Sequence, residues 1–448
     1  MNYRNKKKFL LNKKIVTWLF LILPNLVFAQ SDKNDSTLQT ATLHNCIEYA
    51  IKHNPNLQNA KINEDITETI IRSKLAAWYP QLNFSYNLQH NFQLPTLNFN
   101  GNLAHSGTYN TSGLNLGVTQ NIFSRDVLLA SRSASDVRLS ASQNTENQKI
   151  NLAVAVSKAF YNLILGVQQL RVIEQDILRN AQSYKDALYQ YQSGIVDKTD
   201  YEQAMIALNN SKAQKVSTEQ SLKAEYASLQ ELMGYPLSQK IELVYDTTQM
   251  EKEIYIDTLQ TVNYANRIEI QQLQTQKKLQ AYNLQYYKWS FLPNVSAFGN
   301  YNFNYLNDQF SKLYNAHYPS SYIGITLSLP IFEGGARLQQ IKEAQFEITQ
   351  ADNNIKSQQN SINTQYQTAM GAYKSNLYNF STLKENLSLT SDVYNIIQLQ
   401  YRAGVKAFLD VINAESDLRT AQINYYNALY QVLSSKIDVE QALGNIKY

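Results

Sequence analysis

The chain has 448 residues, of which 17% are charged and 11% aromatic, with 32 tyrosines and one cysteine. A single cysteine, Cys46, excludes an intrachain disulfide. The formal charge of +4 includes six positive and no negative charges in the first 29 residues, so the remaining chain carries +4 less 6, or −2. That balance argues against nucleic-acid binding. Beyond those residues no apolar run approaches about 20 residues, which predicts no transmembrane helix and leaves a soluble protein or a membrane barrel.

Residues 1–29 are organised as an export signal peptide. A basic start precedes an apolar stretch from Ile15 to Phe28, and Val27 and Ala29 have the usual spacing for cleavage before Gln30. A transmembrane anchor is the alternative, but about 14 apolar residues are too few to span a bilayer comfortably.

The rest of the chain repeats itself at an offset of about 210 residues, so we divide it into two helix–hairpin–helix repeats. The first covers 30–234 and the second 258–444, with an equatorial linker at 235–257 and a short tail at 445–448. A repeat this long is not a short-period solenoid. Within the two copies the sequence predicts helices near 43–77, 126–191 and 198–233, and near 258–289, 335–401 and 408–443. The linker is expected to be irregular, with short strands.

Four segments of about ten residues alternate apolar and polar side chains, near 82–91, 112–123, 294–305 and 321–332. Period-two alternation places one set on each face of a strand, and this length crosses a bilayer when tilted. A half-buried sheet of a soluble protein is the alternative, which the pairing of the segments as two hairpins weakens. Because four strands cannot close a barrel, several copies must share one. Two copies give eight strands and a filled interior, whereas three give twelve and room for a conduit.

The two longest predicted helices carry an apolar residue every seven positions, which indicates supercoiled packing against other helices. At 1.5 Å per residue, about 66 residues extend roughly 100 Å, enough to project across the periplasm. The stripes are Val156, Leu163, Leu170, Ile177, Tyr184 and Tyr191 in the first copy and Tyr366, Tyr373, Phe380, Leu387, Tyr394 and Tyr401 in the second.

Each long helix ends in the same pattern, YxxGxxxxxDxxxA. It contains Gly194 and Asp200 in the first copy and Gly404 and Asp410 in the second. Glycine permits the left-handed conformation that ends a helix, so both glycines are hinge candidates. The aspartates are explained either as favourable charges at helix N-termini or, in a trimer, as six carboxylates converging where a tube narrows.

These duplicated turns, the strand-to-helix segment 330–335 and the terminal Ala442-Leu443-Gly444 resemble the TolC family of outer-membrane efflux channels over about residues 42–444. The resemblance implies an α+β membrane protein: a homotrimer with a shared twelve-stranded barrel and a coiled-coil α-helical tunnel in the periplasm. It also implies a periplasmic adaptor and an inner-membrane pump as partners. By resemblance, Asp410 is a tunnel-mouth aspartate and Lys406 a basic gate residue.

Other positions correspond to the family only in part. Asn413 stands where some members carry a second acid, and Asp200 is the first-copy counterpart of Asp410. The Arg-Pro pair expected before the second repeat is Arg267-Ile268 here, while the first repeat has Asn54-Pro55.

No enzyme motif is recognisable in the chain. The five histidines lack zinc-ligand spacing, and Gly334-Gly335 fits a strand-to-helix turn better than a phosphate loop. We therefore predict no catalytic site, metal or cofactor. The predicted function is a passive exit duct for substrates delivered by an inner-membrane pump. The alternatives are an outer-membrane conduit for type I protein secretion and an exported coiled-coil adhesin or scaffold without a pore.

Overall fold

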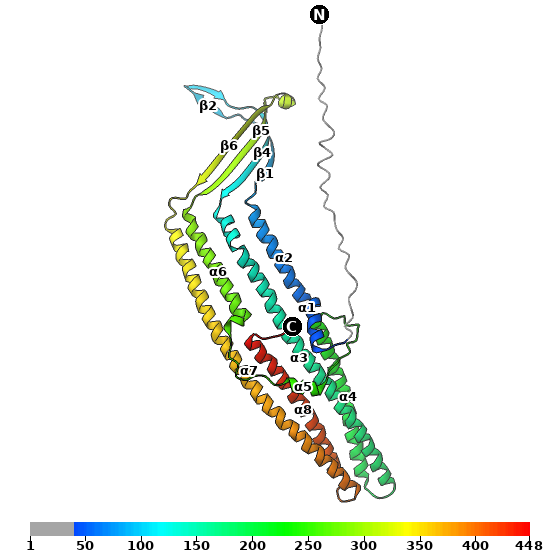
Figure 1. Ribbon diagram of the computed structural model, residues 1–448. Coiled ribbons are helices and arrows are strands. Elements are labelled where there is room, and N and C mark those ends of the chain that lie inside the picture. The colour runs from blue at the N-terminus through cyan, green and yellow to red at the C-terminus, as the bar shows by residue number, and fades with distance from the viewer. Residues whose placement is uncertain (1–39) are drawn as a thin grey trace. The chain divides into compact units, whose positions relative to one another are not determined.

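The computed structural model describes residues 40–448, and the expected signal at 1–29 lies outside the described residues. The described chain is an α+β protein in which long helices lead into and out of one sheet (Figure 1). The helices are α1 (Leu43–His53), α2 (Pro55–Ala76), α3 (Arg125–Gln192), α4 (Lys198–Met233), α5 (Thr247–Glu253), α6 (Ile268–Lys288), α7 (Ala336–Arg402) and α8 (Phe408–Leu443), with short 3₁₀ turns η1 (Tyr264–Asn266), η2 (Trp289–Phe291) and η3 (Phe310–Asn315). The strands are β1 (Gln81–His90), β2 (Thr96–Phe99), β3 (Asn102–His105), β4 (Asn110–Phe123), β5 (Asn294–Asn307) and β6 (Tyr318–Ser328).

The helices pack side by side in two successive sets. Near the sheet, α2 packs on α3, α3 on α6, and α6 on α7; farther away, α4 packs on α3, α3 on α8, and α8 on α7. The two long helices α3 and α7 belong to both sets. Because α2 and α6 begin where α4 and α8 end, each copy joins two short helices end to end beside one long helix (Figure 1).

The main sheet is antiparallel, with strand order β1-β4-β5-β6. Its register places apolar residues opposite one another: Phe84 faces Leu116, and Leu116 in turn faces Tyr301. Val295 of the same face lies opposite Leu327. The alternation seen in each strand therefore adds up to one continuous apolar face across four strands, as a lipid-facing sheet requires.

The opposite face of the sheet is polar and rich in amides. Asn115 on β4 donates a hydrogen bond from Nδ2 to Oδ1 of Asn302 on β5, and Asn302 donates to Oγ of Ser320 on β6 at 3.2 Å. Gly113 and Gly117 of β4 lie on this face, where the amides of Asn87 and Asn300 occupy the space that a Cβ would need. The polar face is thus closely covered by neutral hydrogen-bonding groups.

Two strand expectations need correction. The fourth strand, expected to reach 332, ends at Ser328 because Pro330 has no N–H to pair and Gly334 and Gly335 turn the chain with φ of 60° and 85°. The connection between the first two predicted strands contains a further hairpin, β2–β3, whose tight turn uses Asn100 and Gly101, both at positive φ.

The helices also depart from expectation at three places. The helix predicted over 43–77 is broken at Asn54, which is extended because Pro55 follows it. The helix predicted from 258 begins only at Ile268. In the linker, the expected short strands reduce to one bridge between Ala41 and Leu243, and residues 247–253 form α5 instead.

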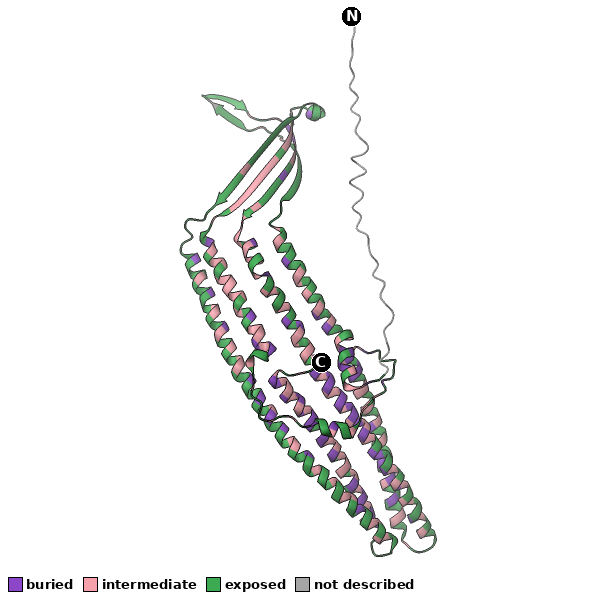
Figure 2. Cartoon of the chain, in the orientation of Figure 1, coloured by how far each residue is buried: buried purple, intermediate pink, exposed green. Residues whose placement is uncertain are grey.

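The predicted stripes are better buried in the second copy than in the first. Tyr366, Tyr373, Phe380 and Tyr394 are buried, whereas Tyr191 is exposed. Buried residues concentrate on α3 and α8, and the sheet is largely exposed in a single chain (Figure 2). Contrary to expectation, one described helix, α3, has a stretch long and apolar enough to cross a membrane, and 44% of that stretch is buried inside the protein.

Each end-to-end joint is closed by a residue that precedes the short helix near the sheet. Asn54 accepts the N–H of Leu57 at 3.0 Å and donates Nδ2 to the carbonyl of Leu232 at 2.8 Å. In the second copy the Nη1 of Arg267 donates to the carbonyls of Gln441 and Ala442 at 3.0 and 2.7 Å. Asn54 and Arg267 are different residue types, but both donate hydrogen bonds to the last carbonyls of a helix, Asn54 to α4 and Arg267 to α8.

Gly234→Ala is expected to lower the free energy of unfolding by at least about 2 kcal/mol. Gly234 ends α4 with φ of 68°, and a Cβ there would lie 2.5 Å from the backbone oxygen of His53. Thermal melting of the helical signal at a fixed scan rate measures the loss. Gly371→Ala is the matched control: Gly371 lies inside α7 with nothing within 4 Å of its would-be Cβ, so it should be neutral or stabilising. Equal melting of both variants would refute this account of the joint.

Candidate functional site

The chain turns back twice at the end farthest from the sheet, between α3 and α4 and between α7 and α8 (Figure 1). Gly194 and Gly404 have φ of 72° and 74°. The next residue of each turn donates its N–H backwards, Ile195 to Gln190 and Val405 to Gln400, both at 2.9 Å. This pattern of a left-handed glycine with a 6→1 hydrogen bond closes a helix C-terminus tightly. The two tips are therefore built alike, and their role as hinges stays a prediction.

Asp410 and Lys406 lie together at the second tip. The Asp410 carboxylate accepts the backbone N–H of Ala407 at 3.2 Å, so it caps the start of α8. Lys406 Nζ lies 3.8 Å from Oδ2 of the same carboxylate. Since both side chains are about two-fifths exposed, this pair contributes little stability by itself.

Asp200 occupies the equivalent third position of α4, where the N-cap residue, Asp197, makes no side-chain cap hydrogen bond. Burial raises the pKa of Tyr401, and the negative charge of Asp200 raises it further. The Asp200 carboxylate therefore lies near the α7 tip. Asn413 is exposed on α8. Within one described chain, then, Lys406 and Asp410 are in contact, while Asp200 lies close enough to Tyr401 of the other hairpin to affect it electrostatically and Asn413 is exposed.

The two hairpins touch each other near their tips through one apolar cluster and one hydrogen bond. Phe408 at the start of α8 is buried against Ala187 of α3 and Ala204 of α4. The hydroxyl of Tyr401 donates to Oε1 of Gln190 at 3.0 Å. Ala204 is the last residue of the duplicated pattern, and a small residue there gives Phe408 its space.

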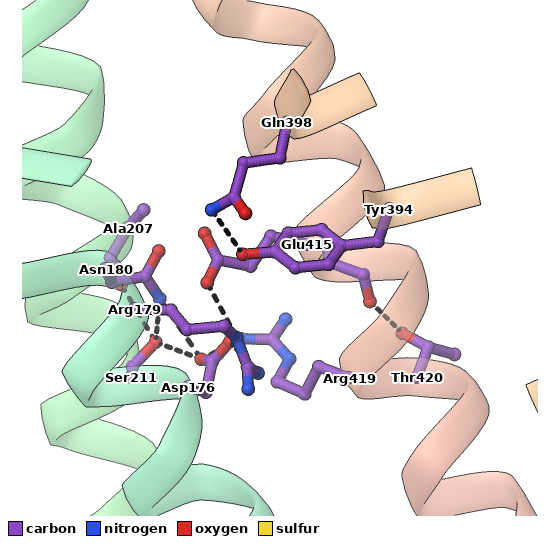
Figure 3. A network of polar contacts seen from close by, with 11 residues as sticks. Asp176, Arg179, Asn180, Ala207, Ser211, Tyr394, Gln398, Glu415, Arg419 and Thr420 are labelled. Carbon is purple, nitrogen blue, oxygen red and sulfur yellow. Dashed lines mark hydrogen bonds and ion pairs between the residues drawn. The ribbon is translucent and has the colours of Figure 1, made fainter. Parts of the chain in front are cut away.

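Above the tips lies a charged cluster, with two buried carboxylates and two partly exposed arginines, that sequence reasoning missed (Figure 3). The charged cluster consists of Asp176 and Arg179 on α3 and Glu415 and Arg419 on α8. Arg179 Nε donates to Glu415 Oε1 at 2.9 Å, and Arg419 Nη1 donates to Asp176 Oδ2 at 3.3 Å. The available signal was a charged residue within an apolar helix face, because Val411, Ala414 and Leu418 around Glu415 are all buried.

The two carboxylates of the charged cluster differ in how well they are satisfied. Asp176 is fully buried and also accepts hydrogen bonds from Ser211 Oγ at 2.6 Å and from Asn180 Nδ2 at 3.2 Å. Glu415 is 2% exposed, and its second oxygen, Oε2, is buried without a hydrogen-bond partner. Burial therefore raises the pKa of Glu415 to about 7, although the neighbouring arginines act in the opposite direction.

A cleft of about 620 Å³ opens between the hairpins beside the charged cluster. Two cations line the cleft, Arg179 and Arg402. Hydroxyl and amide groups also line it, among them those of Tyr394, Gln190 and Gln398. Across residues 40–448, no group of three or more His, Cys, Asp or Glu side chains is arranged to hold a metal ion.

Four strands with one lipid-compatible and one polar face, joined to two long helical hairpins, define a subunit of an outer-membrane channel. The sequence profile of the outer membrane efflux protein family matches residues 46–235 and 263–445, and the chain belongs to that family. The resemblance inferred from the duplicated turns is thereby confirmed, as are the fold class, the outer-membrane location and the function as an efflux channel.

Individual relatives agree with this assignment. Outer membrane protein TolC of Vibrio cholerae is 21% identical over 442 residues, covering 95% of each chain. Alkaline protease secretion protein AprF of Pseudomonas aeruginosa is also 21% identical, covering 94% of this chain and 87% of its own. Among solved structures, the open state of the MtrE outer membrane channel of Neisseria gonorrhoeae superposes with a TM-score of 0.72 at 17% identity, covering 90% of this chain and 88% of that one.

Proposed function

We propose that three copies of this chain form one passive duct through the outer membrane, with the sheet in lipid and the helical tips in the periplasm. The observation that carries the proposal is the sheet itself. Its outer strands, β1 and β6, each pair on one side only within the described chain. Unpaired strand edges are not tolerated in lipid, so the edges of neighbouring copies must pair. Three copies give twelve strands, with the amide-rich face lining the lumen.

The amide-rich face includes the hydrogen-bonded side chains of Asn115, Asn302 and Ser320. Such a face is suited to line a water-filled passage that binds no substrate tightly. We further propose that an inner-membrane pump supplies energy and that a periplasmic adaptor links it to the tips, because the duct has no energy source of its own. No enzymatic step is needed.

A second candidate is a conduit for type I protein secretion. The similarity to AprF, named as an alkaline protease secretion protein, favours it. Both candidates use the same duct and differ only in cargo. Deleting the protein and comparing drug sensitivity with the secreted proteins of the culture separates them. The adhesin alternative is disfavoured by the lipid-length strands.

The protein is expected to purify from outer membranes as a detergent-stable trimer that conducts ions in planar bilayers. Chemical cross-linking in the membrane should end at the trimer, because closing twelve strands leaves no free edge. A monodisperse monomer that keeps its strand signal in mild detergent contradicts the shared barrel. A trimer that never conducts supports a scaffold instead.

A further inference from the structure

The two helical hairpins are held to each other mainly along a single helix pair. α3 packs along α4, and α7 along α8, whereas the hairpins meet chiefly through α3 and α8. Any motion that parts the α7–α8 hairpin from the α3–α4 hairpin must therefore separate α3 from α8. We call the contact between α3 and α8 the seam. The charged cluster lies across the seam, so it is positioned to control such a motion.

The charged cluster supplies two crossed ion pairs across the seam, where Lys158 of α3 also pairs with Asp438 of α8 nearer the sheet. Arg179 of α3 reaches Glu415 of α8, and Arg419 of α8 reaches Asp176 of α3. Arg179 Nη2 also lies 3.5 Å from Asp176 Oδ1, which links the two pairs. From α7, Tyr394 faces the cluster, and from α4 the uncharged Ser211 binds Asp176 (Figure 3).

The cost of burying the cluster falls unevenly on its members. Asp176 has three additional donors besides Arg419, so its charge is well solvated by the protein. Glu415 has one donor, Arg179, and its Oε2 is buried with none. A buried carboxylate oxygen without a donor is costly when ionised and much less so when protonated. Separating α3 from α8 would return Glu415 to water.

We propose that the charged cluster is a proton-sensitive latch between the hairpins, closed when Glu415 is protonated and weakened when Glu415 ionises. The proposal rests on the proposed duct, since the latch matters only if the tips part to let cargo enter. The latch joins α3 and α8 of one chain and does not include the residues at the tips. Glu415 acts as a positioning residue, because its side chain contacts Arg179 of α3 and not the cargo.

The direction of the effect follows from linkage. The ordinary pKa of a glutamate is 4.5, and burial raises that of Glu415 to about 7 in the latched state. The latched state therefore binds the proton more tightly, and its advantage is fully present below pH 4.5. It declines as pH rises through the window between 4.5 and 7 and is lost above 7. The open-to-closed ratio of each chain should rise roughly tenfold per pH unit in that window.

Conductance of purified trimers in planar bilayers, recorded from about pH 5 to pH 8, tests the latch. The parent should open more as pH rises and then level off. Glu415→Gln, which mimics the protonated acid in shape and charge, should flatten the profile at the low-pH level. Asp417→Asn is the matched control, because Asp417 is an exposed carboxylate two residues away on the same helix, and it should keep the parental profile.

Two further variants give shifts of opposite sign. Arg179→Gln removes the cation that favours ionised Glu415, so the pH at which the conductance levels off should rise. Asp176→Asn removes a neighbouring negative charge, so the pH at which the conductance levels off should fall. General destabilisation of the seam would move both in the same direction. The latch is refuted if Glu415→Gln keeps the parental pH dependence, or if the two shifts have the same sign.

A distance measurement tests the latch without ion flow. Spin labels at exposed Leu178 of α3 and Leu409 of α8, in a Cys46→Ser background, should separate as pH rises in the parent and stay together in Glu415→Gln. Silent bilayers at every pH contradict the duct itself, and the label distance then still decides the latch. An unchanged distance across the pH range overturns it.

Discussion

Leu116→Arg and Leu327→Arg are each expected to reduce assembled protein in the outer membrane severalfold. Both residues lie on the continuous apolar face, Leu116 opposite Tyr301 and Leu327 opposite Val295. Arginine at the bilayer midplane costs about 2–4 kcal/mol, and a trimer contains the substitution three times. Immunoblots of outer-membrane fractions, with and without heating, measure the amount of folded trimer.

Asn115→Arg and Thr326→Arg are the matched controls for this prediction. Each lies next in sequence to one of the leucines and points to the opposite face of the same strand. A charge there meets water and neighbouring amides, although Asn115→Arg also removes the hydrogen bond to Asn302. Both should assemble better than the leucine variants. Equal tolerance on the two faces would mean that the sheet does not sit in lipid as proposed.

Much of the fold was predictable because it depends on periodic patterns. Alternation in β1 and β4 was visible residue by residue, and it requires that apolar residues such as Phe84 and Leu116 lie on one face, as they do. The long helices and their glycine ends were predictable for the same reason, since a repeated pattern appears twice in the chain. The hairpin β2–β3 was missed although Asn100-Gly101 is a strong turn signal.

The charged cluster could not be assigned from the sequence because its partners are more than 200 residues apart. Helical spacing shows that Asp176 and Arg179 share a face of α3, and that Glu415 and Arg419 share one of α8. It does not show that those two faces meet. Likewise, the sequence showed Arg267 without its proline but not that its guanidinium closes the end of α8. Long-range pairing requires the packing of the whole helical set.

Lys406→Glu is expected to raise the conductance of the trimer severalfold by loosening the tip. Lys406 is 3.8 Å from Asp410 in the same chain, and reversing its charge places two carboxylates four residues apart. In a trimer the mouth would then carry three more negative and three fewer positive charges, so the tips repel each other. Planar-bilayer recordings of purified trimers measure the change. Lys198→Glu at the first tip is a control for charge reversal, because Lys198 pairs with Glu202 and not with a gate candidate.

Asp410→Asn separates the two explanations of the aspartate, which are helix capping and a charged mouth. An asparagine can still accept the N–H of Ala407, so the cap survives while the charge is lost. If the carboxylates form a ring at the mouth, the trimer should lose much of its cation preference, because fewer charges focus the field in a narrow opening. Asp410→Ala removes both functions and should in addition lower the melting temperature. Reversal potentials measured in a salt gradient report the selectivity directly. Should Asp410→Asn match the parent while Asp410→Ala is only less stable, Asp410 is a helix cap and the mouth is set elsewhere.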